Sequence, residues 1–188
     1  MKMVAAAKLK RAQDKVTELR PYSNKLNEIL SNLSDSISNV LFEQRDVKNK
    51  LFIVVASDKG LCGSFNSNIF KLFNSVSENN NDHLDSINIL PIGKKAYDFF
   101  KKKDYNVIDQ FWNTLNGFSY ADASNIFDYV QDEYLNNNID QVHIIYNEFK
   151  NVAVQNSVVE QFLPVENNLE EDNNCLLYTS PSPRDCLL

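Results

Sequence analysis

A glycine-bearing turn, SDKGLCG at residues 57–63, contains the residue types in this chain that are most suited to chemistry. It stands between an apolar run and a helical pattern, which is where a phosphate-binding loop lies in a nucleotide-binding domain. The spacing argues against a phosphate site, because the turn has neither three spaced glycines nor a glycine loop that ends in Lys and Ser or Thr. The alternative is a structural turn, in which Gly60 and Gly63 adopt conformations closed to other residues and Asp58 bonds its own turn.

Cys62 is the candidate nucleophile of this turn, and we expect it to be a buried structural thiol. A catalytic cysteine needs a base, and neither His83 in a polar linker nor His143 in an expected strand has a sequence reason to meet it. Acidic pairs such as Glu170 with Glu171 are adjacent and point differently, which suggests solvation. We therefore predict no catalytic residue, no bound cofactor and no metal site.

Apolar residues recur with a seven-residue period over the first 40 residues, which predicts a coiled-coil helix. No second long helix that could pair with it is expected in the rest of the chain. The seam must therefore be covered by a helix from elsewhere. The strongest seam positions are Leu9, Val16, Leu19, Leu26, Leu30, Leu33 and Ile37.

Pro21 is unfavourable inside a helix, because proline removes one helical hydrogen bond. The heptad register continues across it and places it on the outer face, which favours one bent helix. The alternative is two helices that are split at Arg20, since a residue before proline disfavours the helical region.

Composition indicates one globular domain beside this helix. The chain has 188 residues, 43% of them hydrophobic, and a net charge of −6, which argues against general nucleic-acid binding. Residues 1–20 hold six basic and two acidic residues, so the start of the helix is +4 and the remainder −10. A basic helical face is usually a solvated surface, and the sharper alternative is an acidic protein partner. No apolar run is long enough to insert into a membrane.

After Lys50 the hydrophobic period changes to alternating strand and helix patterns, which predict a Rossmann-like α/β domain with a mainly parallel sheet. The last strand should be antiparallel, because the polar turn at Lys150 and Asn151 leaves no room for a crossover helix. The expected strands are 51–56, 87–92, 105–111, 142–149 and 152–165, and the expected helices are 66–76, 94–103 and 120–135.

We expect three segments: a coiled-coil shaft helix at 1–48, an α/β domain at 49–166, and an acidic linker with a non-native tail at 167–188. The tail contains a repeated Cys-Leu-Leu, and it resembles translated cloning or sequencing-adaptor sequence. It is left out of the fold prediction.

Three motifs carry a specific resemblance: MKMVAAAKLKRAQ at 1–13, Arg20-Pro21-Tyr22, and SDKGLCGSFN at 57–66. In this order and spacing they resemble the gamma subunit of the F-type ATP synthase, the rotating central shaft. The resemblance covers about residues 1–172. It implies that the chain is a fragment, which lacks the start of the family's sequence and the returning C-terminal helix.

The resemblance implies a non-catalytic subunit that couples proton-driven rotation to ATP synthesis. Its implied partners are the alpha and beta subunits of the catalytic ring, the epsilon subunit and the membrane rotor ring. The implied location is peripheral, on the cytoplasmic face of a bacterial plasma membrane, with the inner face of a mitochondrial or plastid membrane as the alternative. The residues it places at partner contacts are Lys8, Lys10, Arg11, Asp58 and Lys59.

Two other functions stay open at this point. One is a homodimeric coiled-coil adaptor whose seam pairs with its own copy, with Ser23 selecting the register. The other is a nucleotide-binding α/β protein, which would need a phosphate site at Gly60 to Gly63.

Overall fold

Two units make up this chain in the computed structural model, and each is described by itself. The first contains helix α1 (Lys2–Leu33), and the second spans residues 39–166. The structure describes residues 2–33, 40–79, 86–103, 105–115, 117–151 and 154–165. The predicted tail at 167–188 and the seam residue Ile37 lie outside these ranges.

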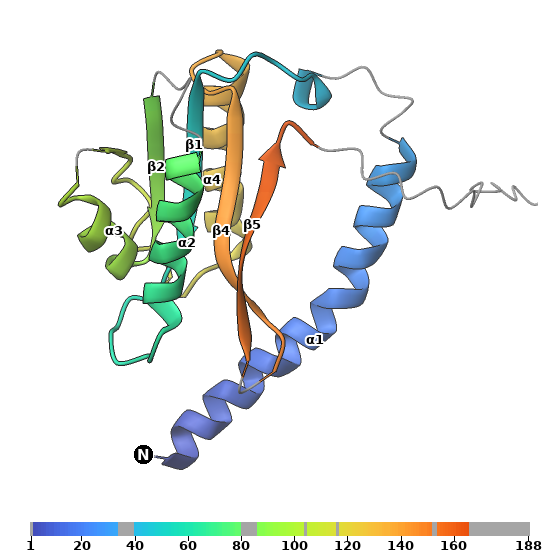
Figure 1. Cartoon of the computed structure of the whole chain (residues 1–188). Helices are drawn as coiled ribbons and strands as arrows, with labels where there is room; N and C mark the ends of the chain where they lie inside the picture. The colour runs from blue at the N-terminus through green and yellow to red at the C-terminus, as the bar shows by residue number, and fades with distance from the viewer. Residues whose placement is uncertain are drawn as a thin grey trace, which may run out of the picture. The chain divides into compact units, whose positions relative to one another are not determined.

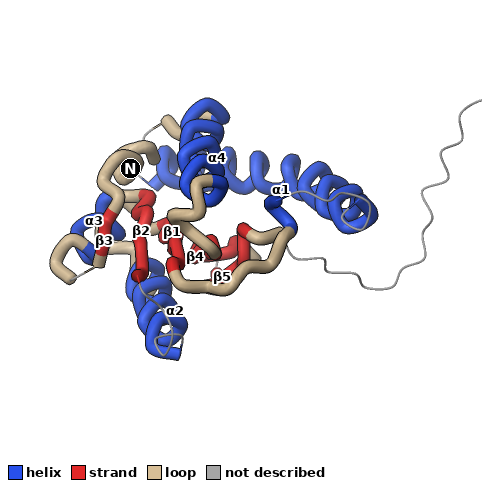
Figure 2. The backbone as a smooth tube through the Cα atoms, turned by 90° about the horizontal axis from the view of Figure 1, so that it is seen from above, coloured by secondary structure: helices blue, strands red, loops and turns tan. Residues whose placement is uncertain are grey.

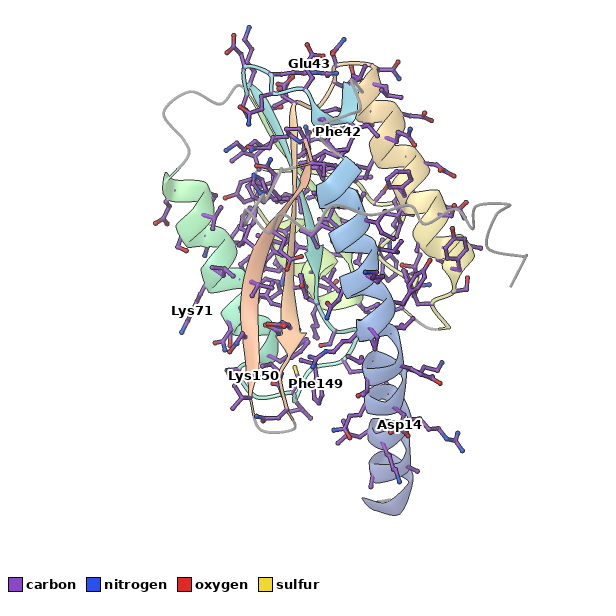
Figure 3. All side chains as sticks on the ribbon, turned by 90° about the vertical axis from the view of Figure 1, so that its right-hand side faces the viewer. Asp14, Phe42, Glu43, Lys71, Phe149 and Lys150 are labelled. Atoms are coloured by element: carbon purple, nitrogen blue, oxygen red, sulfur yellow. The ribbon has the colours of Figure 1, made fainter. Side chains whose placement is uncertain are left out.

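Helix α1 runs without a break through Pro21, so the prediction of one helix is confirmed over the split at Arg20. Its 32 residues correspond to a rod of about 48 Å at 1.5 Å per residue. The helix is shorter than the expected 1–48 segment, because residues 43–48 carry no helix and Val40–Phe42 form a short 3-10 helix, η2. Side chains such as Asp14 project from it into solvent (Figure 3).

Strand β1 (Asn49–Val55) is the centre of the second unit. Its run of Leu, Phe, Ile and Val is buried on both faces, as a continuous apolar run predicts. Neighbouring residues point to opposite sides of a strand, so β1 contributes side chains to two separate cores.

Figure 1 shows β2, β1, β4 and β5 side by side, and they belong to a five-stranded sheet in the order β3-β2-β1-β4-β5 (Figure 2). Strands β1, β2, β3 and β4 run parallel to one another, whereas β5 is antiparallel to β4. The predicted mixed sheet with an antiparallel last pair is confirmed. The other strands are β2 (Ser86–Ile92), β3 (Asn106–Val107), β4 (Gln141–Phe149) and β5 (Gln155–Leu163).

Helices cover both faces of the sheet (Figure 2). On one face α2 (Phe65–Asn79) and α3 (Lys94–Phe100) pack an aromatic core, in which the rings of Phe73 and Phe100 lie 4.8 Å apart, edge to face. On the other face α4 (Tyr120–Leu135) inserts Ile126, Val130 and Tyr134. A capping box between Ser119 and Asp122 begins α4.

The third strand is the main departure from the predicted elements. We expected a strand at 105–111, but only Asn106 and Val107 pair with β2. Ile108 and Phe111 pack instead against the core beneath α4, so these apolar residues belong to a loop.

The segment that leads into β1 is held by α4. The Tyr134 ring is fully buried, and the Arg45 guanidinium lies 4.5 Å from its centroid while Arg45 Nη1 donates to the Tyr134 carbonyl at 3.1 Å. Asp140 Oδ2 accepts the backbone N–H groups of Lys48 and Asn49, which ties the start of β1 to the start of β4.

His143 on β4 is a half-buried titratable group whose Nδ1 atom is buried. Its ring stacks on Phe52 with centroids 5.5 Å apart, and its Nδ1 has no hydrogen-bond partner among the described residues. Burial, followed by the positive charge of Lys50, lowers the pKa of His143 to about 4. The native protein therefore carries a neutral imidazole at pH values where the unfolded chain binds a proton.

We predict that His143 makes the α/β unit less stable as the pH falls from about 6.5 toward about 4. In this window the unfolded state binds a proton that the native state does not, so one site adds a slope below about 1.4 kcal/mol per pH unit. Urea unfolding at pH 7 and pH 5 measures the slope, with His143→Phe as the matched variant. An equal loss of stability in both proteins would contradict the prediction.

Candidate functional site

The predicted seam of α1 is exposed wherever the structure describes its side chains. Leu19 is 62% exposed, although a leucine gains free energy by burial. The side chains of Leu30 and Leu33 are outside the described set. The other described seam residues are Leu9 at 45%, Val16 at 37% and Leu26 at 40% exposure.

Basic residues accompany this seam near the start of α1. Lys10, Arg11 and Lys15 are exposed, and the side chain of Lys8 lies outside the described set. Opposite charge on a partner would be attracted to this end of the helix. The helix thus presents an apolar stripe and a basic end on one rod.

The turn at 57–66 is organised by the side chain of Asn66, in the first turn of α2. Its Oδ1 accepts from the Ser57 backbone N–H at 3.1 Å, and its Nδ2 donates to Ser57 Oγ at 2.8 Å and to Cys62 Sγ at 3.2 Å. Ser57 Oγ in turn donates to the Lys59 carbonyl at 2.6 Å. One side chain therefore connects both ends of the turn.

Asp58 bonds a different segment from the one that the sequence suggested. We expected it to bond its own turn, but Asp58 Oδ1 accepts the backbone N–H of Lys94 at 3.0 Å. The two segments lie close together because Gly93, at φ +101°, has no side chain: a Cβ there would overlap the Ala56 carbonyl oxygen. Asp58 is consequently a brace between the β1–α2 and β2–α3 connections.

Leu61 and Cys62 form the exposed tip of the turn. Leu61 is fully exposed at φ +63°, a conformation that costs a leucine roughly 1–3 kcal/mol, and the sequence analysis did not single it out. Cys62 is exposed, so the prediction of a buried thiol was wrong. The expectation for the glycines holds for Gly63, at φ +61°, whereas Gly60 has no such angle.

Two N–H groups at the ends of the turn are used within it: those of Ser57 and Phe65 donate to Asn66 Oδ1 and the Cys62 carbonyl. The Cys62 thiol contacts Ser57, Asn66 and the Lys59 carbonyl, none of which is a base. Lys59 is exposed beside this tip, so the geometry suits contact with a protein surface.

Two features of the described residues bear on other kinds of site. No group of three His, Cys, Asp or Glu side chains is arranged to hold a metal ion in the described part of the chain. None of the described helices has the length and apolar character that crossing a bilayer requires.

Comparison with known proteins gives one consistent result. A family model described as ATP synthase matches residues 1–187, a range that includes most of the segment set aside as tail. The ATP synthase gamma chain of Chloroherpeton thalassium is 41% identical over 181 residues, which cover 92% of this chain and 59% of that protein. The gamma chain of Cytophaga hutchinsonii is 42% identical over 173 residues, covering 88% of this chain and 59% of that one.

A solved structure agrees with these relatives. A chain in the central stalk/c-ring structure of the Tetrahymena thermophila mitochondrial ATP synthase superposes with a TM-score of 0.57 at 27% identity. The superposition covers 87% of this chain and 70% of that chain. The present chain spans about 59% of the length of the two bacterial relatives.

We predict that Asn66→Ala lowers the free energy of unfolding by about 1–3 kcal/mol, because it leaves the Ser57 N–H without its acceptor and releases the turn. Asn68→Ala is the matched control on the same helix, since the Asn68 side chain makes a single 3.4 Å contact with Ser64 Oγ. Its effect should stay within about 0.5 kcal/mol. Urea unfolding followed by Trp112 fluorescence measures both, and equal effects would show that Asn66 does not organise the turn.

Proposed function

The chain belongs to the ATP synthase gamma chain family, and on that premise we propose that it is part of the central rotating shaft of an F-type ATP synthase. The shaft itself forms and breaks no bond of ATP. It couples rotation that is driven by proton flow to conformational change in the catalytic subunits.

The exposed seam of α1 is the observation that carries this proposal. Each Leu or Val of the seam gains about 1.5–3 kcal/mol when it is fully buried, so a partner helix is strongly favoured. In the full-length protein we assign the partner to a second, antiparallel helix, which would complete a coiled coil. This coiled coil enters the ring of alpha and beta subunits.

An asymmetric shaft acts on the beta subunits as an allosteric effector. Each beta subunit meets a different face of the shaft, and a contact that is stronger in one conformation shifts the population toward it. Rotation then moves every catalytic site through states of different nucleotide affinity. The α/β unit lies at the base of the shaft, where the epsilon subunit and the membrane rotor ring bind, so the protein is peripheral to the membrane.

The charged residues at the start of α1 and in the turn at 57–66 suit contacts that form and break during rotation. Exposed ion pairs contribute only about 0–1 kcal/mol each, which suits brief contact better than permanent attachment. We assign Lys8, Lys10 and Arg11 to contacts with the beta subunits, and we assign Asp58 and Lys59 to partner contacts of the α/β unit, as the resemblance implies.

A homodimeric adaptor remains the second candidate, because an exposed seam could also pair with its own copy. A cysteine at Leu19 distinguishes the two, since a parallel dimer brings both copies of this position together. Rapid disulfide formation between two chains supports the dimer, and its absence supports the shaft. A nucleotide-binding function has less support, because the turn lacks the glycine spacing of a phosphate-binding loop.

We predict that Leu19→Asp in the full-length protein abolishes assembly with the alpha and beta subunits. Burying the Asp carboxylate in the seam without an opposite charge is costly, so the coiled coil does not form. Asn24→Asp, an exposed position outside the seam of the same helix, should leave assembly intact. Size-exclusion chromatography of the co-expressed subunits measures this, and normal assembly of Leu19→Asp would remove the main support for the shaft.

We predict that changing Lys8, Lys10 and Arg11 together to Gln leaves assembly intact but lowers the number of protons pumped per ATP hydrolysed. The loss should be largest at low salt, where attraction in the unmodified protein is least screened. The assay uses reconstituted vesicles that contain the whole complex. Changing Lys48, Lys71 and Lys102 to Gln removes the same charge from the α/β unit as a control. An unchanged proton-to-ATP ratio at low ionic strength would contradict the proposed contacts.

A further inference from the structure

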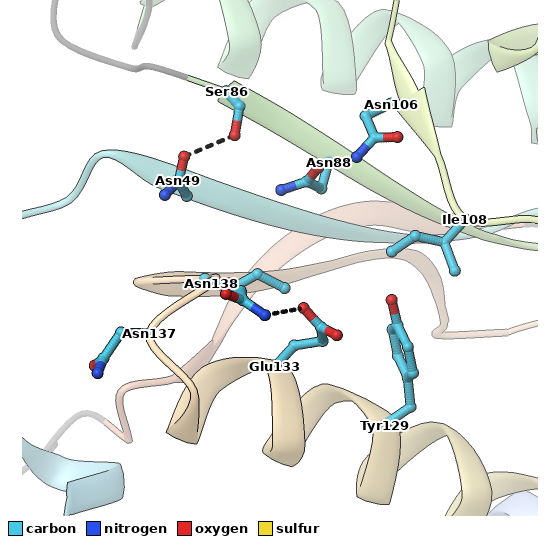
Figure 4. Close-up of a pocket in the computed structure, with 10 residues that line it drawn as sticks. Asn49, Ser86, Asn88, Asn106, Ile108, Tyr129, Glu133, Asn137 and Asn138 are labelled. Atoms are coloured by element: carbon cyan, nitrogen blue, oxygen red, sulfur yellow. Dashed lines mark hydrogen bonds between the residues drawn. The ribbon is translucent and has the colours of Figure 1, made fainter.

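A polar cavity of about 370 Å³ lies between the sheet and the C-terminal half of α4 (Figure 4). It opens at the amino ends of the parallel strands, the edge opposite to the turn at 57–66. Its volume lies in the range of small-molecule sites. The described lining residues are Asn49, Ser86, Asn88, Asn106, Ile108, Tyr129, Glu133, Asn137, Asn138 and Ile139.

The cavity exists because asparagine replaces apolar residues at the start of three strands. Side chains two apart share a face, so Asn49 continues the row of Leu51 and Ile53, which face α4. Asn88 continues the row of Leu90 and Ile92 in the same way, and Asn106 is its register partner on β3. Asparagine is disfavoured in strands, so amide side chains at these positions stabilise the sheet less than apolar side chains would.

Hydrogen bonds between the lining residues use only part of their capacity. Asn49 Oδ1 accepts from Ser86 Oγ at 2.7 Å, and Asn88 Oδ1 accepts from Asn106 Nδ2 at 2.6 Å. Within the described residues, the Nδ2 groups of Asn49 and Asn88 have no acceptor. These donors remain for a ligand oxygen.

The α4 side of the cavity offers acceptors. Asn138 Nδ2 donates to Glu133 Oε2 at 3.0 Å, which leaves Glu133 Oε1 and Asn138 Oδ1 without a donor among the described residues. The Tyr129 hydroxyl points from α4 toward the sheet (Figure 4), and it makes no hydrogen bond to the described part of the chain. Burial and then the Glu133 carboxylate raise the pKa of Tyr129.

The electrostatics of the cavity favour a cation. Glu133 is the one charged residue of the described lining, and the C-terminal end of a helix carries partial negative charge. This helix end already binds a guanidinium: Arg45 Nη1 donates to the Tyr134 carbonyl at 3.1 Å and to Asn137 Oδ1 at 2.6 Å. Arg45 makes no ion pair with Glu133, so that carboxylate remains for a second cation.

We propose that this amide-lined cavity binds a guanidinium group whose carrier also bears a carbonyl or hydroxyl oxygen. The guanidinium donates to Glu133 Oε1 and to the neighbouring amide oxygen of Asn138. The carrier's oxygen accepts from the Nδ2 groups of Asn49 and Asn88. This function is separate from rotation, and it holds whether or not the proposed shaft role is correct.

Side-chain amide resonances provide a direct test on the ¹⁵N-labelled chain. N-acetyl-L-argininamide is titrated in parallel with N-acetyl-L-citrullinamide, which replaces the guanidinium by an uncharged urea of the same shape. We expect saturable, millimolar-range shifts that are confined to the amides of Asn49, Asn88, Asn106 and Asn138, with the citrulline compound at least fivefold weaker. Equal affinity for both compounds, or shifts that do not saturate, would overturn the proposal.

Matched variants of α4 locate the charge that matters. Glu133→Gln should weaken binding of the arginine compound at least fivefold, whereas Asp128→Asn removes an exposed charge from the same helix and should leave it unchanged. Unaltered backbone resonances away from the cavity verify that Glu133→Gln is folded. Unchanged binding by Glu133→Gln would also overturn the proposal.

A short peptide separates the two sources of a guanidinium. If acetyl-Gly-Arg-Gly-amide binds as well as N-acetyl-L-argininamide, the cavity receives an arginine side chain of a partner protein. If the peptide is excluded while the single residue binds, the cavity holds a free small molecule. Either result supports the proposed guanidinium site.

Discussion

Burial of β1 on both faces is the constraint on which the α/β unit depends. Leu51, Phe52, Ile53 and Val54 are between 0% and 4% exposed, and successive side chains enter opposite cores. Helices must therefore cover both sides, which requires crossovers before and after β2 and a return to the other side before β4. The turn at 57–66 and the amide-lined cavity lie beyond the two ends of this core.

Helix α1 is governed by the opposite condition. Its apolar stripe has no cover among the described residues, and an isolated helix gains little stability from its own hydrogen bonds in water. The free-energy gain on burying apolar surface thus has two consequences in one chain. In the α/β unit the apolar side chains are buried against one another and stabilise the fold. On α1 they are exposed, so burial against a partner is favoured.

Local sequence patterns correctly predicted the features that depend on neighbouring residues alone. The β-branched run at 51–56 became a buried strand, and the short turn at Lys150 and Asn151 correctly implied an antiparallel last pair. Long-range geometry escaped prediction. The partner of Asp58 is 36 residues away, the exposure of Cys62 depends on how Asn66 folds the turn, and the cavity appears only when three strands are set in register. Strand β3 was overestimated because Ile108 and Phe111 find their burial in a loop.

The pairing of β1 with β4 has a consequence for how this protein is made. Lys50 pairs with Gln141, so one edge of the most apolar strand waits for roughly 90 further residues to be synthesised. At the usual 5–20 residues per second the delay is about 5–18 s. Until then one edge of β1 lacks its native partner, and an unpaired strand edge is a template for pairing with another chain.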